Sequence, residues 1–287
     1  MRENIIYIDD VELYKDSNWD CLLKPRSLIS FSEEKRYTNI LCVGIRKIID
    51  DNYVAHFPHL KYILSPSTGL DHIKITNDNI KIISLNPSDV DDINASSEFT
   101  FLLILSILKK FPRVLSGEIR TDAEDLQNKT LGILGYGRIG KKVAKYAGSM
   151  GANVIWHDIN GGVSKDEIFK ESDIILVAVN CTEENRKYIS KEDFEKMSAK
   201  KPYFINITRG FVVDEEALIY ALDNDQVVAV ALDVVEDKRR FSKYLYHCDS
   251  RVIITPHVAG TTVQSRQKAC NYVIDKLFDI LINKNED

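Results

Sequence analysis

One stretch in the middle of the chain constrains the fold more than any other. Residues 131–158 read LGILGYGRIGKKVAKYAGSMGANVIWHD: an apolar strand, a GxGxxG turn, a helix-length segment and a second apolar strand. Each glycine has a mechanical reason. Gly135 permits a tight strand-to-helix turn, Gly137 lets a ligand approach the backbone, and Gly140 lets the helix pack against the strand. The pattern predicts a βαβ unit of a doubly wound parallel sheet.

The same stretch predicts the ligand. A helix N-terminus offers unpaired N–H groups and the positive end of a dipole to a pyrophosphate. Asp158 follows Gly140 by 18 residues, about where an acid binds the ribose hydroxyls of adenosine. A carboxylate there repels a 2′-phosphate, so the sequence predicts NAD in preference to NADP. An ordinary glycine turn is the alternative, but it leaves the flanking strands and the acid unexplained.

Composition excludes several classes of protein. The chain of 287 residues is long enough for about two domains. A net charge of −5 without a basic stripe argues against nucleic-acid binding. The first residues lack the apolar core of a signal peptide, and the most apolar run, residues 99–108, is too short to span a bilayer. We therefore expect a cytoplasmic protein that binds no membrane.

The cysteines predict neither a metal site nor a disulfide framework. Their number is odd, and none has CxxC spacing, which fits a reducing cytoplasm. Each is expected to be a small buried apolar residue. They are Cys21, Cys42, Cys181, Cys248 and Cys270.

Strand and helix signals alternate along the rest of the chain and predict two α/β domains. Strands are expected at residues 5–8, 40–43, 62–64 and 81–85, and after the fingerprint at 173–179, 203–207, 227–232 and 252–254. Helices are expected to begin near Ser190 and Asp214, each of which can cap one. A helix over 94–110, apolar nearly all round, should be buried. We predict a small domain over residues 1–93, which the C-terminal helix at 264–287 joins, and a nucleotide-binding domain over 94–263.

Polar residues follow several of these strands, where ligands gather in open parallel sheets. Residues 65–69, SPSTG, follow one strand of the small domain and are either a cleft wall or an ordinary turn. Arg209 and His257 each follow a strand of the larger domain. An arginine can bind a carboxylate through two hydrogen bonds, and a histidine can exchange a proton near neutral pH. Taken alone, Arg209 would be interpreted as a surface ion-pair partner and His257 as an ordinary loop histidine. Beside a dinucleotide fingerprint, the two residues together indicate hydride transfer to a 2-oxo acid.

The order of these motifs resembles the NAD-dependent D-isomer-specific 2-hydroxyacid dehydrogenases. The matching strings are GYGRIG, SDIILVAVN, NITRGFVVDEEAL, ALDVVE and VIITPHVAGTT. They cover residues 125–262 densely, whereas the first 95 residues agree mainly through STGLDHI at residues 67–73. The resemblance implies a Rossmann NAD-binding domain, a smaller flavodoxin-like α/β substrate domain, no metal, and a homodimer built on the nucleotide-binding domain.

The resemblance also implies a role for each matching residue. Arg209 would bind the substrate carboxylate and carbonyl, and His257 would be the general acid/base. Backbone amides at Thr68 and Gly69 would hold the carboxylate from the other domain. The implied cofactor-binding residues are Gly135, Gly137, Arg138, Ile139 and Gly140 at the pyrophosphate, Asp158 at the ribose, and Ile207, Asp233 and Gly260 at the nicotinamide end.

One departure from the family concerns the acid that partners the histidine. The family has a glutamate five residues after the aspartate of ALDV, where this chain has Lys238. A lysine there should lower the pKa of the histidine, whereas the glutamate favours its protonated form. Glu236 or Asp237 could replace the acid if the loop is rearranged. The run at 238–240, KRR, is either a site for a second anionic group or a solvated basic loop.

These observations predict an oxidoreductase that transfers a hydride between NAD(H) and a small D-2-hydroxy acid or 2-oxo acid in a cleft between the domains. The alternative is an NAD(H)-binding sensor or scaffold that kept the fold and lost the acid. Retention of both Arg209 and His257 argues against that alternative.

Overall fold

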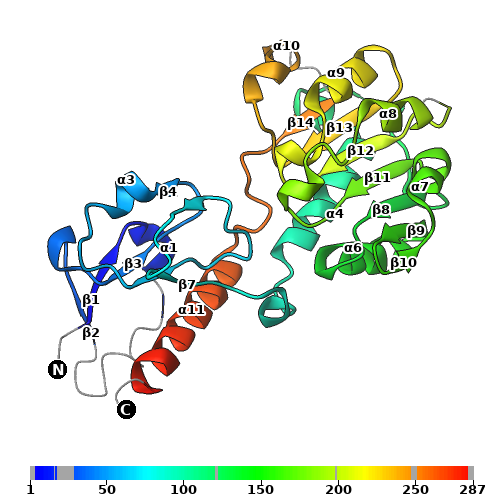
Figure 1. Cartoon of the computed structure of the whole chain (residues 1–287). Helices are drawn as coiled ribbons and strands as arrows, with labels where there is room; N and C mark the ends of the chain where they lie inside the picture. Colours follow the sequence, from blue (N-terminus) through cyan, green and yellow to red (C-terminus); the bar gives the residue numbers. More distant parts are fainter. Residues whose placement is uncertain are drawn as a thin grey trace. The chain divides into compact units, whose positions relative to one another are not determined.

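The chain forms two compact units in the computed structural model (Figure 1). Unit 1 comprises Met1–Ile93 and Thr262–Asp287, and unit 2 comprises Asn94–Thr261. The structure describes residues 4–15, 17, 29–119, 122–197, 199–246 and 251–283. Each unit is built around its own predominantly parallel sheet, with helices on both faces.

Unit 1 contains a five-stranded parallel sheet in the order β2-β1-β3-β5-β7. Its strands are β1 (Asn4–Ile8), β2 (Ile29–Phe31), β3 (Ile40–Cys42), β5 (Tyr62–Leu64) and β7 (Lys81–Ile83). Numbered along the chain this is the order 2-1-3-4-5 of flavodoxin-like folds, so the predicted fold class of the smaller unit is confirmed. The sequence prediction missed β2, because its three residues, ISF, do not form a continuous apolar run like that of the equally short β5.

Helices cover both faces of this sheet. One face packs against α1 (Val11–Tyr14) and the long C-terminal helix α11 (Val263–Asn283). The other face packs against α3 (Asp51–Val54). Lys276 of α11 donates to the Ser84 carbonyl at 3.0 Å and to the Asp89 carboxylate at 2.7 Å. Three short elements complete unit 1: η1 (Lys35–Tyr37), η2 (Pro87–Val90) and the two-stranded pair β4 (Ile49–Asp50) and β6 (Ile73–Lys74).

Unit 2 contains a seven-stranded sheet in the order β10-β9-β8-β11-β12-β13-β14. Its strands are β8 (Thr130–Leu134), β9 (Asn153–Asp158), β10 (Gly161–Gly162), β11 (Ile174–Val177), β12 (Tyr203–Asn206), β13 (Ala229–Leu232) and β14 (Val252–Ile254). This is the Rossmann order 3-2-1-4-5-6 with one further strand. The predicted doubly wound sheet is therefore confirmed.

The edge strand β10 departs from the predicted parallel arrangement because it runs antiparallel to β9. Only two residues separate the strands, and a parallel return needs a crossover of about a dozen residues. Positive φ angles at Gly161 (142°) and Gly162 (90°) allow the chain to turn back at once.

The two faces of the unit 2 sheet carry different helices, as Figure 1 shows. One face packs against α4 (Ala95–Leu108) and α6 (Arg138–Ser149). The other packs against α7 (Lys165–Glu171), α8 (Lys191–Met197) and α9 (Glu215–Asp223). All four residues of β11 are buried, as expected for a strand covered on both faces. The shorter elements are α5 (Phe111–Leu115), α10 (Ser242–Tyr246), η3 (Glu183–Asn185), η4 (Gly210–Val212) and η5 (Lys238–Phe241).

The predicted helix starts are confirmed where side chains cap them. Asp214 caps α9 by accepting from the Ala217 amide at 3.2 Å. At α8 the Asp193 carboxylate accepts from the Ser190 amide at 3.0 Å. Asn94 is the N-cap of α4, but its side chain makes no capping bond.

The cysteine prediction is confirmed in part. Cys42 and Cys270 are buried, whereas Cys181 is partly exposed. Burial raises the pKa of the Cys270 thiol to about 12. Cys21 and Cys248 lie outside the described residues. Among the described residues, no helix combines the length and the apolar character needed to cross a membrane.

Candidate cofactor and substrate site

The predicted site residues of unit 2 all follow the carboxyl ends of its parallel strands. The fingerprint turn follows β8, Asp158 ends β9, Arg209 follows β12, Asp233 follows β13 and His257 follows β14. β8 and β11 are neighbours at the point where the strand order reverses, which is where doubly wound sheets bind nucleotides. The fold therefore brings these residues to one edge of one sheet.

The three fingerprint glycines meet different constraints. A Cβ on Gly135, where φ is 96°, would lie 2.5 Å from the carbonyl carbon of Ala178. A Cβ on Gly140 would lie 2.3 Å from the Gly135 oxygen. By contrast, no heavy atom lies within 4 Å of a Cβ placed on Gly137. Packing thus requires the first and third glycines, while the second leaves open space at the start of α6.

That open space suits a pyrophosphate. The first intrahelical hydrogen bond at this end runs from the Lys141 amide to the Gly137 carbonyl at 3.0 Å. Amides before Lys141 therefore have no intrahelical acceptor, and they face the positive end of the α6 dipole. The backbone and the missing side chain at Gly137 together fit the phosphate groups of a dinucleotide.

Asp158 links the end of β9 to the fingerprint turn. Its carboxylate accepts from the Tyr136 amide at 2.8 Å and from the Asn160 amide at 3.1 Å. The bond from the Tyr136 amide lowers the pKa of this carboxyl below its ordinary value of 3.8. The Tyr136 ring stacks on Trp156 with a centroid distance of 4.3 Å. Asp158 is therefore an anion that is partly exposed and is held beside the turn.

Arg209 lies in a loop that the side chain of Asn206 organises. Asn206 is 1% exposed, and its Oδ1 accepts from the Thr208 amide at 3.0 Å and the Thr208 hydroxyl at 2.8 Å. Its Nδ2 donates to the Arg209 carbonyl at 3.0 Å. The Arg209 guanidinium donates to the Thr208 carbonyl at 2.9 Å and is partly buried. Ile207, predicted at the nicotinamide end, is buried in the core between the sheet and α4.

Asp233 organises the loop that carries His257. Its buried carboxylate accepts from the Thr255 hydroxyl at 2.5 Å, the Val258 amide at 3.0 Å and the Ala259 amide at 2.9 Å. The His257 amide donates to the Asp233 carbonyl at 2.9 Å. His257 itself has a φ of 56°, a left-handed conformation that costs about 1–3 kcal/mol and persists only where its surroundings impose it. The Asp233 carboxylate thus shapes the loop so that the exposed His257 is held in an unusual conformation.

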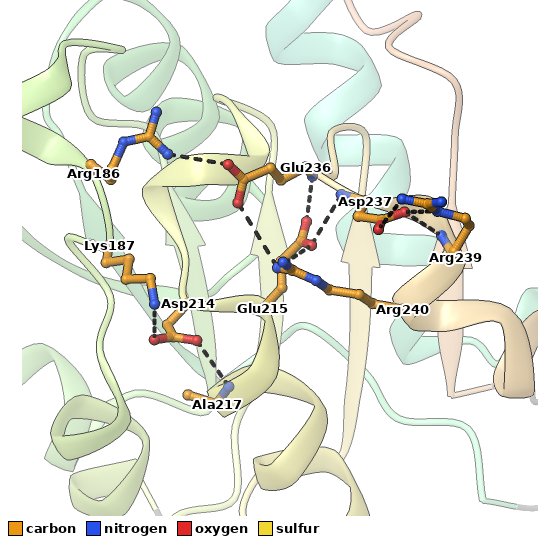
Figure 2. A network of polar contacts seen from close by, with 9 residues as sticks. All are labelled: Arg186, Lys187, Asp214, Glu215, Ala217, Glu236, Asp237, Arg239 and Arg240. Carbon is orange, nitrogen blue, oxygen red and sulfur yellow. Dashed lines mark hydrogen bonds and ion pairs between the residues drawn. The ribbon is translucent and has the colours of Figure 1, made fainter.

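The sequence analysis missed Glu215, which holds the neighbouring loop, residues 234–240 (Figure 2). Glu215 is 3% exposed and accepts from the amides of Glu236 and Asp237 and from the Arg240 guanidinium. Its signal was hidden because two glutamates after Asp214 read as ordinary first-turn acids of a helix.

The structure also locates the side chains around the family's missing acid. Lys238 is exposed at the start of η5. Glu236 lies 3.1 Å from Arg186, and Asp237 lies 2.9 Å from Arg239. Arg239 and Arg240 therefore both have carboxylate partners, which leaves Lys238 as the one cation of this run without an ion pair among the described residues. This arrangement weakens the interpretation of 238–240 as a second anion site.

In unit 1, the loop at 65–69 follows β5 and is held mainly by hydroxyl groups. The buried Ser65 hydroxyl lies 2.9 Å from the Ser67 hydroxyl and 3.1 Å from His72 Nε2. Ser67 donates to the Gly69 carbonyl at 2.8 Å. Within the described part of the chain, the amides of Thr68 and Gly69 donate no hydrogen bond. Two adjacent donors are thus available for a carboxylate.

No metal centre accompanies these loops in the part of the chain that the structure describes. No group of three or more histidine, cysteine, aspartate or glutamate side chains there is arranged to hold a metal ion.

Comparison with known proteins identifies a family. Residues 108–259 match the family model described as "D-isomer specific 2-hydroxyacid dehydrogenase, NAD binding domain". A glyoxylate reductase of Thermofilum pendens is 28% identical over 95% of this chain and 85% of its own length. A D-3-phosphoglycerate dehydrogenase of Methanocaldococcus jannaschii is 31% identical over 87% of this chain, which spans 51% of that longer protein.

Solved structures agree with this match. The D-lactate dehydrogenase of Aquifex aeolicus, crystallised with NAD and lactic acid, has a TM-score of 0.78 and is 25% identical. The alignment covers 99% of this chain and 97% of that one. A glyoxylate reductase of Paecilomyes thermophila, 24% identical, has a TM-score of 0.80 over 98% of this chain and 96% of its own, which shows a shared fold.

Proposed function

Because the chain belongs to the NAD-dependent D-isomer-specific 2-hydroxyacid dehydrogenases, we propose that it interconverts a small 2-oxo acid and the D-2-hydroxy acid. The observation that carries this proposal is the common edge of unit 2. There, Asn206 holds the Arg209 loop and Asp233 holds the His257 loop, beside the nucleotide turn. An anion-binding cation and a proton donor at one strand edge are what 2-oxo acid reduction requires.

We propose that NAD(H) binds along this edge. The α6 N-terminus, with Gly135, Gly137, Arg138, Ile139 and Gly140, would hold the pyrophosphate. Asp158 would accept from the adenosine ribose hydroxyls, and its negative charge would repel a 2′-phosphate. Ile207, Asp233 and Gly260 would lie at the nicotinamide end. NADH, when bound, supplies the hydride.

The chain's own residues would bind the acid and supply the proton. Arg209 would bind the substrate carboxylate and stabilise the charge that develops on the carbonyl oxygen. Protonated His257 would donate its proton to that oxygen, so a 2-oxo acid, a hydride and a proton give a 2-hydroxy acid. The free amides of Thr68 and Gly69 would add two charge-assisted hydrogen bonds to the carboxylate. Glyoxylate and pyruvate are the first substrates to try, since relatives named for glyoxylate and D-lactate match most of the chain.

The experiment is an NADH oxidation assay with a panel of 2-oxo acids, including glyoxylate, pyruvate, hydroxypyruvate and dicarboxylic or phosphorylated members. Turnover by the wild type should fall by about 100- to 10,000-fold in His257→Ala and by a comparable factor in Arg209→Ala. Turnover that survives in either variant would contradict the assigned role of that residue.

A second candidate function, a non-catalytic NAD(H) sensor, is favoured by one observation. The position of the family's catalytic glutamate carries the exposed Lys238. Tight NADH binding without turnover of any 2-oxo acid would select this second function.

Lys238 gives the dehydrogenase a recognisable pH dependence. If reduction needs a charged histidine, a nearby lysine disfavours that form and a glutamate favours it. Lys238→Glu should therefore move the upper pH limit of reduction upward. Lys238→Met is the control, because it removes the positive charge without adding a negative one. An unchanged pH–rate profile in both variants would contradict this proposal.

We further propose a homodimer built on unit 2. Four apolar side chains around α5 are strongly exposed, from 45% for Phe111 to 95% for Ile119, with Val114 and Leu115 between them. Exposed apolar patches of this kind mark protein interfaces. Light scattering should give the mass of two chains, and Leu115→Glu with Val114→Glu should shift it to one; a monomeric wild type would contradict the proposal.

A further inference from the structure

We propose that Glu215 is a positioning residue, which sets the conformation of the substrate anchor Arg209 through the backbone of residues 235–237. This inference rests on the role proposed for Arg209 above. Glu215 is the first residue of α9 and lies outside the strand-end loops, so it would touch neither substrate nor cofactor. Its effect would pass through two peptide groups.

The first step is the attachment of the 234–240 loop to Glu215. One carboxylate oxygen accepts from the Glu236 amide, and the other accepts from the Asp237 amide at 3.2 Å and the Arg240 guanidinium at 3.3 Å (Figure 2). A carboxylate that is only 3% exposed is costly to bury unless it is paired and hydrogen-bonded. Here the positive end of α9 and three donors stabilise it. The loop therefore has one strong internal anchor.

The second step is the contact between this loop and Gly210. A Cβ on Gly210 would lie 2.0 Å from the Glu236 nitrogen and 2.3 Å from the Val235 carbonyl carbon. The two backbones are thus packed with no room for a side chain. Because Gly210 directly follows Arg209, the 235–236 peptide sets where the Arg209 loop ends. Asn206 holds the same loop from its other side.

Exposed ion pairs stabilise the contact between this loop and Gly210 less strongly than Glu215 does. Arg186 lies 3.1 Å from Glu236, and its guanidinium lies 4.8 Å from the Phe211 ring centroid. The side chains of Arg186 and Glu236 are each 45% exposed, and exposed pairs contribute little. Glu215 is therefore the dominant attachment of the loop.

The neighbouring residue Asp214 provides a matched control. It carries the same charge and also sits at the start of α9, where it caps the Ala217 amide and lies 2.9 Å from Lys187 (Figure 2). Unlike Glu215, Asp214 bonds to no residue of the 234–240 loop among the described residues; its partners are Ile189, Lys187 and Ala217. If acidic residues at the start of α9 had only a structural role, replacing Glu215 and replacing Asp214 would change activity and hydrogen exchange to the same extent.

The test compares Glu215→Gln with Asp214→Asn in the full chain. Glu215→Gln keeps the size of the side chain but turns an N–H group toward amide donors. A displacement of the anchor by about 1 Å should lower kcat/KM for the 2-oxo acid about 100-fold, mainly through KM, with the NADH Kd within about threefold. Asp214→Asn should change kcat/KM less than about threefold.

Hydrogen–deuterium exchange gives a readout that does not depend on activity. In Glu215→Gln, exchange should quicken in peptides covering both 234–240 and 206–213, and in Asp214→Asn in neither. Quickening confined to 234–240, or equal losses of kcat/KM in the two variants, would overturn the inference. A wild type without turnover would contradict the proposed function alone, because the exchange comparison still decides whether Glu215 controls the Arg209 loop.

If Glu215→Gln does not fold, Arg240→Gln removes one exposed partner of the same carboxylate, and unchanged exchange at 206–213 would then overturn the inference.

Discussion

The carboxyl edges of the two sheets are built differently. In unit 2, three loops at this edge are each held by one buried polar side chain: Asn206 for the Arg209 loop, Asp233 for the His257 loop and Glu215 for the 234–240 loop. In unit 1, the loop after β5 is held by the Ser65 hydroxyl, and it presents two backbone amides. The comparison teaches that the three loops of unit 2 depend on particular buried side chains, whereas the loop of unit 1 offers a ligand mainly its backbone amides.

The largest effect should come from removing Asp233, the buried carboxylate that holds the His257 loop. Asp233→Ala leaves the buried Ala259 amide and the partly buried Val258 amide without their acceptor, and it should lower the free energy of unfolding by about 4 kcal/mol. Turnover should be lost with it. Urea denaturation measures the change. Asp166→Ala, at an exposed ion pair of α7, is the control and should lower the free energy of unfolding by less than about 1 kcal/mol. Equal losses of stability in the two variants would contradict the role of Asp233 in holding the loop.

The next effect separates two glycines of the same turn. Gly135→Ala combines a strained φ of 96° with a backbone clash, and it should lower the free energy of unfolding by about 3 kcal/mol. Gly137→Ala has neither problem, so its stability should change by less than about 1 kcal/mol while its NADH Kd rises at least about tenfold. Urea denaturation and fluorescence titration give the two values. An unchanged NADH Kd in Gly137→Ala would place the pyrophosphate elsewhere.

Unit 1 should show the reverse pattern, with backbone changes exceeding side-chain changes. Gly69→Pro removes one proposed amide donor and should raise the KM for the 2-oxo acid about tenfold. Thr68→Ala keeps both donors and should change KM less than about twofold. Steady-state kinetics decides between them. A larger effect from Thr68→Ala would mean that the hydroxyl, and not the amide, binds the substrate.

The smallest effect concerns Asp158, which is partly exposed. Asp158→Asn should weaken NADH binding about fivefold and reduce the preference for NADH over NADPH. Because hydrogen bonding lowers the pKa of this carboxyl below 3.8, the stabilisation it gives is complete above pH 3.8 and is lost as the pH falls through the lower folded value. NADH titrations should thus show no midpoint from Asp158 between about pH 5 and pH 8. A midpoint in that range that disappears in Asp158→Asn would contradict this assignment.

The sequence could predict those features that depend on local requirements. The fingerprint was recognisable because packing allows only glycine at Gly135 and Gly140, and the strand-end motifs were recognisable because polar residues directly follow apolar strands. The strands β2, β4, β6 and β10 were missed because each has only two or three residues, with polar residues or glycines among them, and so lacks the continuous apolar run that made the equally short β5 and β14 recognisable. Glu215 was missed because its partners are backbone amides 21 and 22 residues later in the chain, which leave no mark in the local pattern.

The partners around Lys238 were equally hidden. The spacing from Asp233 placed a lysine where the family has its glutamate, but it could not show that Glu236 and Asp237 are already paired with arginines. The Glu236–Arg186 pair joins the loops after β11 and β13, which only the structure brings together, whereas the Asp237–Arg239 pair lies within one loop.

The most direct test of the central claim is the identity of the product. Pyruvate, or the best 2-oxo acid of the panel that yields a chiral product, should be incubated with NADH and the protein, and the hydroxy acid should be resolved by chiral chromatography. We expect one D-2-hydroxy acid formed for each NADH consumed, and none with His257→Ala. An L product, or NADH oxidation without a hydroxy acid, would contradict the account.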